Sequence, residues 1–167
     1  MQTTLVTHPV PPMRHGPTPQ GREPVPCAHA QGPAFDADAT FVAMLSAYRC
    51  SGGLARVDEV VTLLEGGGHS AVAALARWIV ERSVISFEWQ GQTWLPWFQF
   101  GAAGHVPGPA VRAVIDVLGT VYDGWELAHW FARPNSALAG CAPVDRIVSH
   151  ADAVLQAARA DRFITKG

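Results

Sequence analysis

Proline is distributed very unevenly along this chain, and its distribution limits where a fold can form. Eight of the thirteen prolines lie within residues 1–33, a segment that contains no Phe, Trp or Tyr. Proline fixes φ and lacks an amide N–H, so a segment this rich in it forms neither a helix nor a sheet ladder. We therefore expect residues 1–33 to be a disordered tail, and the fold to be built from the residues that follow.

The whole chain has the composition of a globular protein. It has 167 residues, of which 49% are hydrophobic, enough for one compact domain or two very small ones. The three cysteines are widely spaced and form no CxxC pair, which favours a reducing compartment. The sequence has no apolar run of about 18 residues and no secretory leader, so we expect a cytoplasmic protein without membrane contact.

Hydrophobic spacing predicts three helices within residues 34–100. The first runs to Tyr48, the second covers 54–65, and the third begins at a cap at Ser70 and continues to about Arg82. Asp36 or Asp38 is the expected cap of the first helix, and glycine-rich breaks at 51–53 and 66–68 separate the three.

The pattern then changes to a β-hairpin. ISFEW and TWLPWFQF, within residues 84–100, are rich in β-formers and are separated by Gln90-Gly91-Gln92. Pro96 should end the second strand or place it at an edge. Because three helices followed by a hairpin is the order of a small winged-helix unit, residues 34–100 are predicted to form a degenerate, winged-helix-like unit.

Residues 101–167 are predicted to form a second, wholly helical domain. After a linker rich in glycine and proline, helices are expected over 109–118 and from the capping box Asp123–Glu126 to Phe131. Pro134 ends the latter, Pro143 opens a short helix, and a capping box at 149–152 opens a last one. The expected buried side of that last helix comprises Val154, Leu155, Ala158 and Phe163. The predicted fold class is therefore mainly α with one β-hairpin.

The motifs of common enzymes are missing. No two of the seven histidines lie three or four residues apart, and the sequence has no HExxH and no GxSxG. Gly66-Gly67-Gly68 follows a predicted helix without a subsequent Lys-Ser/Thr, so it does not indicate phosphate binding. We expect no catalytic residue, no metal and no cofactor.

Direct DNA binding is disfavoured by charge. A helix-turn-helix reading of the second and third helices would place Ser70, Arg77 and Arg82 near DNA. Residues 34–100 nevertheless hold four arginines against seven acidic residues, a net of −3. A protein that reads DNA must neutralise phosphates, and this module repels them on average.

One stretch of the C-terminal half carries a specific pattern. Residues 130–147 read WFARPNSALAGCAPVDRI, which resembles the C-terminal toxin-binding domain of the Xre/MbcA/ParS antitoxins. In that family a helix ends in W-[LF]-x-x-P-N-x-x-L-x-G-x-x-P. The matching residues here are Trp130, Phe131, Pro134, Asn135, Leu138, Gly140 and Pro143, and the pattern continues at Val154, Ala157 and Ala158. The resemblance covers about residues 95–164.

The resemblance implies an antitoxin of a type II toxin–antitoxin system. Such a protein neutralises a RES-domain toxin, which destroys NAD, by covering its active site, and it forms a homodimer or a hetero-oligomer with the toxin. The toxin-binding candidates are Trp130, Phe131, Pro134, Asn135 and Leu138, together with Arg159, Arg162, Phe163 and Lys166 of the last helix. The alternative is an orphan DNA-binding regulator or adaptor that carries the same domain without a toxin.

Overall fold

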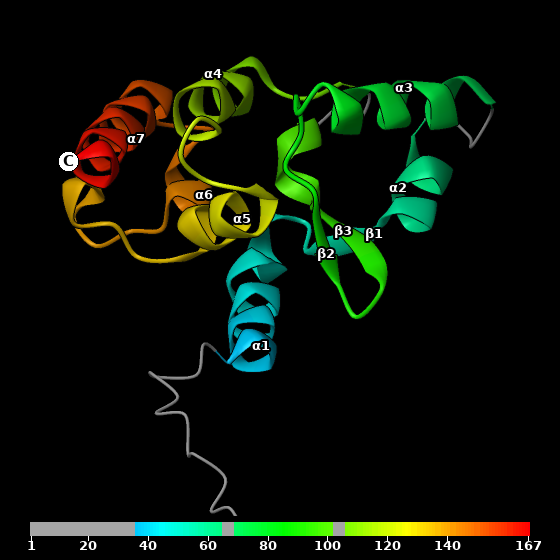
Figure 1. Ribbon diagram of the computed structural model, residues 1–167, viewed down its shortest axis with the longest axis horizontal. Helices are drawn as coiled ribbons and strands as arrows, with labels where there is room; N and C mark the ends of the chain where they lie inside the picture. The colour runs from blue at the N-terminus through cyan, green and yellow to red at the C-terminus, as the bar shows by residue number, and fades with distance from the viewer. Residues whose placement is uncertain (1–35, 65–68, 102–105) are drawn as a thin grey trace, which may run out of the picture. The chain divides into compact units, whose positions relative to one another are not determined.

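The computed structural model describes residues 36–64, 69–101 and 106–167. Their fold is mainly helical, as predicted, and the predicted hairpin belongs to a small three-stranded antiparallel sheet. The α-helices are α1 (Ala37–Tyr48), α2 (Val57–Leu63), α3 (His69–Val80), α4 (Pro109–Leu118), α5 (Gly124–Ala132), α6 (Pro143–Arg146) and α7 (Ala151–Lys166) (Figure 1). The strands are β1 (Leu54–Arg56), β2 (Phe87–Trp89) and β3 (Gln92–Pro96). The predicted tail at 1–33 and the glycine break at 66–68 lie outside the described residues.

Several helix starts follow the predicted capping chemistry. Asp36 caps α1, because its Oδ1 accepts the Ala39 N–H at 3.0 Å. At α5 the Asp123 carboxylate accepts the Glu126 N–H, and the Glu126 carboxylate accepts the Asp123 N–H, both at 2.8 Å. This reciprocal pair is the capping box read from the sequence, and it satisfies two N–H groups that the helix itself leaves unpaired. The predicted starts at Pro109 and Pro143 are also confirmed.

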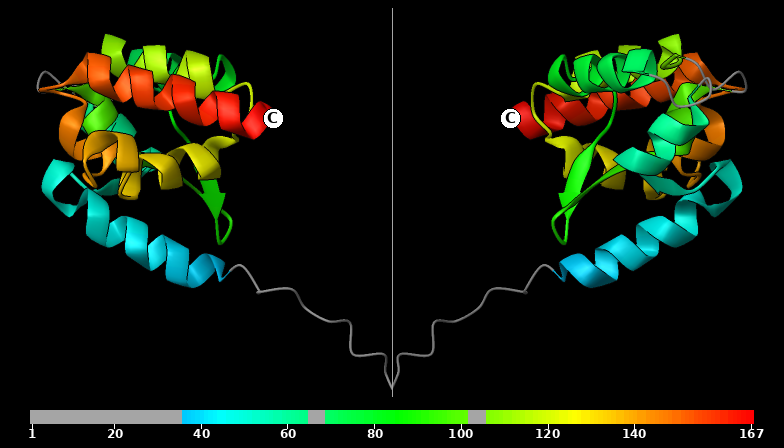
Figure 2. Two further views of the ribbon diagram at one scale, coloured as in Figure 1. Left: turned by 90° about the vertical axis from the view of Figure 1, so that its left-hand side faces the viewer. Right: turned by 90° about the vertical axis from the view of Figure 1, so that its right-hand side faces the viewer.

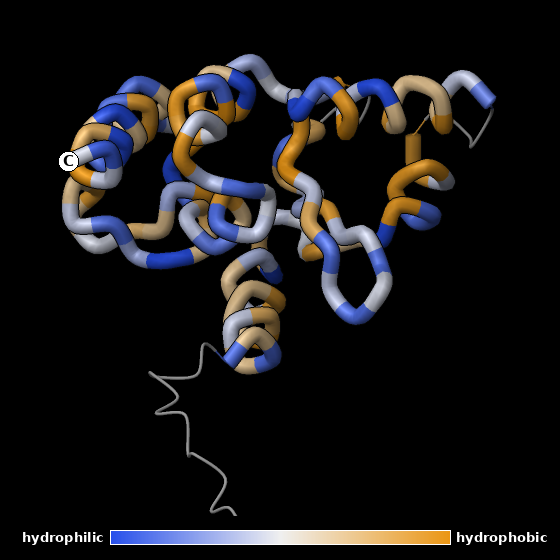
Figure 3. The backbone as a smooth tube through the Cα atoms, in the orientation of Figure 1, coloured by the Kyte–Doolittle hydropathy of each residue, from blue (hydrophilic) through white to orange (hydrophobic). Residues whose placement is uncertain are grey.

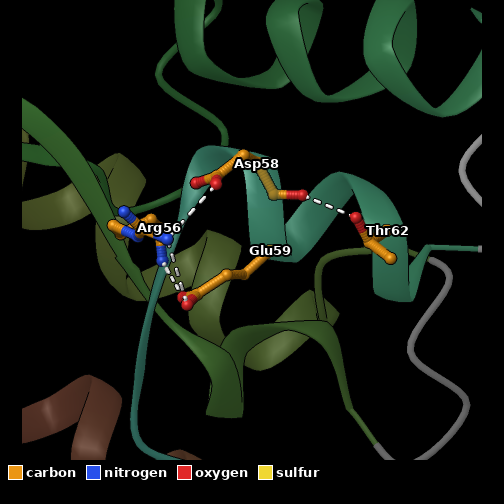
Figure 4. A network of polar contacts seen from close by, with 4 residues as sticks. All are labelled: Arg56, Asp58, Glu59 and Thr62. Carbon is orange, nitrogen blue, oxygen red and sulfur yellow. Dashed lines mark hydrogen bonds and ion pairs between the residues drawn. The ribbon is translucent and has the colours of Figure 1, made fainter.

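The predicted helix over 54–65 is wrong in its first turn. Residues 54–56 form β1 and pair with β3, so the helix begins only at Val57. Figure 4 shows the start of α2, where the Glu59 carboxylate accepts the Arg56 N–H at 2.8 Å. The Arg56 guanidinium lies 3.4 Å from Asp58 and 3.6 Å from Glu59. The spacing of the apolar residues could not reveal β1, because its pairing partner lies some forty residues later in the chain.

The sheet has the order β1-β3-β2, with both pairs antiparallel. The hairpin turn consists of Gln90 and Gly91, whose φ values are +49° and +72°, typical of a two-residue turn. As predicted, β3 ends at Pro96, but β3 is the central strand and not an edge. The predicted strand does not continue over 97–100, which forms a 3₁₀ turn.

The 3₁₀ turn at 97–100 contains Gln99, whose side-chain amide pairs with the backbone of Ile85 as a neighbouring strand would. The Gln99 side chain is fully buried; its Oε1 accepts the Ile85 N–H at 2.7 Å, and its Nε2 donates to the Ile85 carbonyl at 3.0 Å. Both backbone groups of Ile85 are therefore satisfied inside the core without a neighbouring strand.

Three further predicted boundaries differ from the structure. Helix α3 ends at Val80, because Arg82 has a φ of +52°, and Ser70 lies inside the helix and does not cap it. The predicted capping box at 149–152 does not form: His150 occupies the cap position without a side-chain cap bond, and Ser149 Oγ lies 2.8 Å from His150 Nδ1.

The sheet separates two hydrophobic cores. Alternation along β3 sends Trp94 to one face and Leu95 to the other. The larger core joins the Trp94 face of the sheet to α1 and α4–α7, and its best-buried members include Tyr48, Val114, Trp130, Phe131 and Val154. The smaller core consists of Val60, Leu64, Leu75, Val84, Leu95 and Phe100, and it joins α2 and α3 to the opposite face. Figures 1 and 2 show α2 and α3 side by side, and α7 along α4.

Helix α1 therefore packs with the C-terminal helices. The Tyr48 hydroxyl donates to the Ala128 carbonyl of α5 at 2.6 Å, and burial raises the pKa of Tyr48 well above 10.0, so the hydroxyl keeps its proton. Residues 35–167 form one compact unit. The finer division into domains at 34–100 and 101–167 stays a prediction.

Candidate functional site

The residues of the family-like pattern lie at the end of α5, and most of them are buried. Trp130 is 2% exposed, Phe131 0%, Leu138 7% and Asn135 8%. Only Pro134 of the predicted set in this stretch lies at the surface. These four buried side chains therefore shape the helical core, and a partner that docks here meets Pro134 and the backbone around it.

A carboxylate of α7 holds two of these residues in place. Asp161 Oδ2 accepts the indole N–H of Trp130 at 2.6 Å and the side-chain N–H of Asn135 at 2.9 Å. The side-chain oxygen of Asn135, Oδ1, in turn accepts the Ala137 N–H at 2.9 Å, which opens the short 3₁₀ turn that follows. Hydrogen bonds to an ionised carboxylate are stronger than neutral ones, so this set fixes α7 against the end of α5. We call it the Asp161 lock.

Asp161 is not among the residues that the sequence predicts for the site. It lies in the predicted last helix, one turn beyond Ala157 and Ala158, which the family-like pattern includes. The helical period places residues 157, 158 and 161 on one side of a helix, so the spacing alone indicates that Asp161 lies on the same side as the buried alanines. Its two partners, Trp130 and Asn135, come from a segment about thirty residues earlier, and only the packing of α5 against α7 reveals them.

The four candidates at the end of α7 do come together. Arg159, Arg162, Phe163 and Lys166 line one shallow hollow of about 230 Å³. The Phe163 side chain is 82% exposed and the neighbouring Ile164 is 74% exposed. Figure 3 shows this end of α7 as a mixture of hydrophilic and hydrophobic residues. An aromatic ring among cations is suited to bind an acidic surface that also has an apolar contact.

The prediction that Phe163 lies on the buried side of α7 is wrong. The buried residues of α7 are Val154, Ala157 and Ala158. At 3.6 residues per turn, Phe163 lies roughly 140° around the helix from Ala158, so it points away from that face. The Phe163 side chain is left in solvent.

The cations around Phe163 are not engaged elsewhere. Among the described residues, the ion pairs involve Arg56 with Asp58 and Glu59, and none involves Arg159, Arg162 or Lys166. The one carboxylate within this stretch, Asp161, already accepts the two hydrogen bonds of the lock. The guanidinium groups of Arg159 and Arg162 are therefore available to carboxylates of a partner.

The DNA-binding candidates are exposed, but their surroundings are not basic. Ser70, Arg77 and Arg82 all lie at the surface, on or just after α3. The same helix exposes Val72 at 50% and Val80 at 83%. At 3.6 residues per turn, Val72 lies roughly 140° around α3 from Arg77, so Val72 belongs to a different side of the helix from Ser70 and Arg77. What disfavours DNA at the side of Ser70 and Arg77 is the net charge of −3 over residues 34–100.

A second hollow of about 210 Å³ lies beside the lock and is lined by His129 among other residues. Burial and the nearby Arg133 charge lower the pKa of His129 from 6.5. The imidazole therefore stays neutral at a pH where an ordinary histidine begins to charge.

None of the helices among the described residues combines the length and apolar character needed to cross a bilayer. Within the same residues, no cluster of His, Cys, Asp or Glu has the makings of a metal site. Comparison of the chain with protein-family models, with curated proteins and with solved structures finds no match.

Proposed function

We propose that this protein is a binding module that neutralises a toxin by covering it, an antitoxin for a RES-type, NAD-degrading enzyme. The observation that carries the proposal is the position of the Asp161 lock. The family-like residues Trp130 and Asn135 hold Asp161, and the next two residues, Arg162 and Phe163, begin the exposed end of α7. The pattern that suggests the family thus also sets the position of the surface that would meet the toxin.

The chemistry of that surface suits the mouth of a NAD-cleaving pocket. Such a pocket is expected to carry a carboxylate, and the guanidinium of Arg162 can bind a carboxylate through two parallel hydrogen bonds. Phe163 supplies an aromatic anchor of the kind that dominates the energy of protein interfaces. Neither residue needs to perform chemistry, because occupying the pocket is sufficient to stop the toxin.

Co-expression with the toxin tests the proposal. If the gene beside this one encodes a RES-type protein, that protein is the toxin to use, expressed in bacteria with the wild-type chain or with an Arg162→Ala/Phe163→Ala variant. We expect the variant to fold normally, since it leaves Asp161 intact, and to lose most of its protection against growth arrest. The matched control is Val148→Ala, which changes a side chain that is 92% exposed and lies outside this surface. Full protection by the double variant would contradict the proposed contact.

The second candidate is an orphan DNA-binding regulator. The order of elements from α1 to β3, with β1 between the first two helices and the strand order β1-β3-β2, supports a winged-helix unit. The net charge of −3 over 34–100 weighs against DNA. Arg56 is also partly neutralised by Asp58 and Glu59, as Figure 4 shows.

A gel-shift assay with the DNA upstream of the gene separates the two candidates. We expect weak or no specific binding at physiological salt. Salt-sensitive binding tighter than about micromolar would favour the regulator. The absence of a toxin gene beside this one would also favour the regulator.

A further inference from the structure

A long apolar groove runs beside α3, on a part of the chain that the proposed toxin contact does not use. Its volume is about 690 Å³. The walls come from α2 and α3, from the β2–β3 hairpin and from the start of α5, and they include Val61, Ile79, Phe87 and Trp125. We call it the α2–α3 groove.

The groove is open along α3, and its apolar rim faces solvent. Val72, Ala76 and Val80 line it at intervals of four residues, and the exposed fractions of the two valine side chains are 50% and 83%. Residues four apart in a helix lie on one side, so these three form a straight ridge of roughly 12 Å, which is about two helical turns. A small molecule held deep in a pocket would not cover this outer rim, whereas a macromolecular partner would.

The polar groups of the groove are few, which favours a helical occupant. Ser86 and Thr93 are its neutral polar residues. An extended peptide would bring unpaired N–H and C=O groups into this apolar surface, and burying them is costly. The edge strand β2 has only three residues and offers little pairing. A helix satisfies its own backbone and packs its i, i+4 ridges against those of α3.

The charge of the groove specifies the occupant further. The charged residues that line it, Glu88 and Asp123, are both acidic, and neither forms an ion pair among the described residues. Glu88 accepts a hydrogen bond from the Thr93 hydroxyl, and Asp123 caps α5, so both carboxylates are held at the rim. The surrounding unit, residues 34–100, carries a net charge of −3, which attracts cations and disfavours a second copy of this chain.

We propose that the α2–α3 groove binds an amphipathic helix of a partner protein, with the apolar side of that helix against Val72, Ala76 and Val80 and a Lys or Arg near Glu88 and Asp123. This inference does not rest on the proposed antitoxin function, because none of the groove residues belongs to the toxin-contact set.

The test measures binding of a fluorescein-labelled amphipathic model peptide made of Leu and Lys, by anisotropy in about 0.15 M NaCl. Its matched counterpart is the same peptide with Glu in place of Lys. We expect the full-length chain to bind the Lys peptide and to leave the Glu peptide free. Equal binding of the two peptides would overturn the charge argument and with it the proposal.

Two sets of variants locate the contact. Val72→Ser/Val80→Ser should weaken binding of the Lys peptide about tenfold, since it removes apolar area from the rim. Glu88→Gln/Asp123→Asn should reduce the preference for Lys over Glu, and asparagine keeps the cap of α5. The control Val148→Ser removes a valine that is 92% exposed outside the groove, and it should bind like the wild type.

Two results would overturn the proposal. If Val72→Ser/Val80→Ser binds as tightly as Val148→Ser, the peptide does not use the groove. If sedimentation shows a dimer that the same double variant disperses, a second copy occupies the groove. Should the double variant unfold, Val80→Ser alone serves, because that side chain is 83% exposed and contributes little to the core.

Discussion

Helices α3 and α7 are both amphipathic, but they are held in very different ways. α3 has one fully buried residue, Leu75, and belongs to the smaller core. α7 buries Val154, Ala157 and Ala158 in the larger core and is fastened to α5 by Asp161. A helix with so little of its own surface buried leaves an apolar side for a partner, whereas a well-anchored helix can project a charged end. The two surfaces proposed here follow from that difference.

The largest expected effect comes from Gly124→Ala, which disturbs the place where the two cores meet. A Cβ at residue 124 would overlap the carbonyl oxygen of Ser86, so α5 must move away from the segment before β2. We expect the free energy of unfolding to fall by about 3 kcal/mol in urea denaturation.

Its control is Gly108→Ala, where the nearest atom to a Cβ is the Gln99 carbonyl oxygen at 3.7 Å, an ordinary contact. Equal stability losses in the two variants would show that the close approach of α5 and Ser86 does not hold the cores together.

Asp161→Ala tests whether the anchoring of α7 depends on the lock. The variant leaves the Trp130 indole N–H and the Asn135 side-chain N–H without their acceptor, at partly buried positions. We expect thermal or urea unfolding to show a loss of about 2 kcal/mol.

Two matched variants support the interpretation of that loss. Asp161→Asn retains an acceptor oxygen and should lose less, and Asp152→Ala removes an exposed carboxylate from the first turn of the same helix. If Asp161→Ala unfolds like Asp152→Ala, the lock contributes nothing and α7 is held by apolar packing alone.

Tyr48→Phe examines the assignment of α1 to the larger core. The change removes the hydroxyl that donates to the Ala128 carbonyl at 2.6 Å and keeps the ring. One buried hydrogen bond corresponds to about 1 kcal/mol of stability, measurable by urea denaturation. Wild-type stability would mean that ring packing alone joins α1 to α5.

The smallest expected effect on stability is that of His129→Gln, and it depends on pH. Burial and Arg133 lower the pKa of His129 in the folded state, so as the pH falls below 6.5 the unfolded chain takes up a proton before the folded chain does. The free energy of unfolding should therefore decrease on acidification through this range, and part of that decrease should be absent in His129→Gln. Thermal melts of both proteins at several pH values check this, and identical profiles would contradict it.

Local signals in the sequence identified most of the helices. Asp36, the Asp123–Glu126 pair, Pro109 and Pro143 act within one turn of their own position, so the starts of α1, α4, α5 and α6 were predictable. The secondary structure was predicted wrongly where it depends on a partner distant in the sequence. Residues 54–56 form a strand, and not the first turn of a helix, because β3 pairs with them.

The candidate site shows the same division. The spacing of Arg159, Arg162, Phe163 and Lys166 placed them on one part of a helix, and the structure brings them around one hollow. Asp161 could not be predicted, because a lone aspartate in a helix has the same sequence pattern as an exposed carboxylate, and its two donors come from residues 130 and 135. The α2–α3 groove was also invisible, since its walls come from segments spread over residues 57–125.

By itself, the sequence determined the helical class, the hairpin turn, the caps of α1 and α5 and the clustering of cations on the last helix, because each depends on residues within a few positions of one another. Only the tertiary structure decided that residues 54–56 form β1, that two cores lie on opposite faces of the sheet, that Asp161 forms the lock, and that Phe163 and Val80 are exposed. These features depend on which surfaces come into contact when distant segments pack. The free energy gained by burial depends on both surfaces of the contact, so the sequence of either segment alone does not predict it.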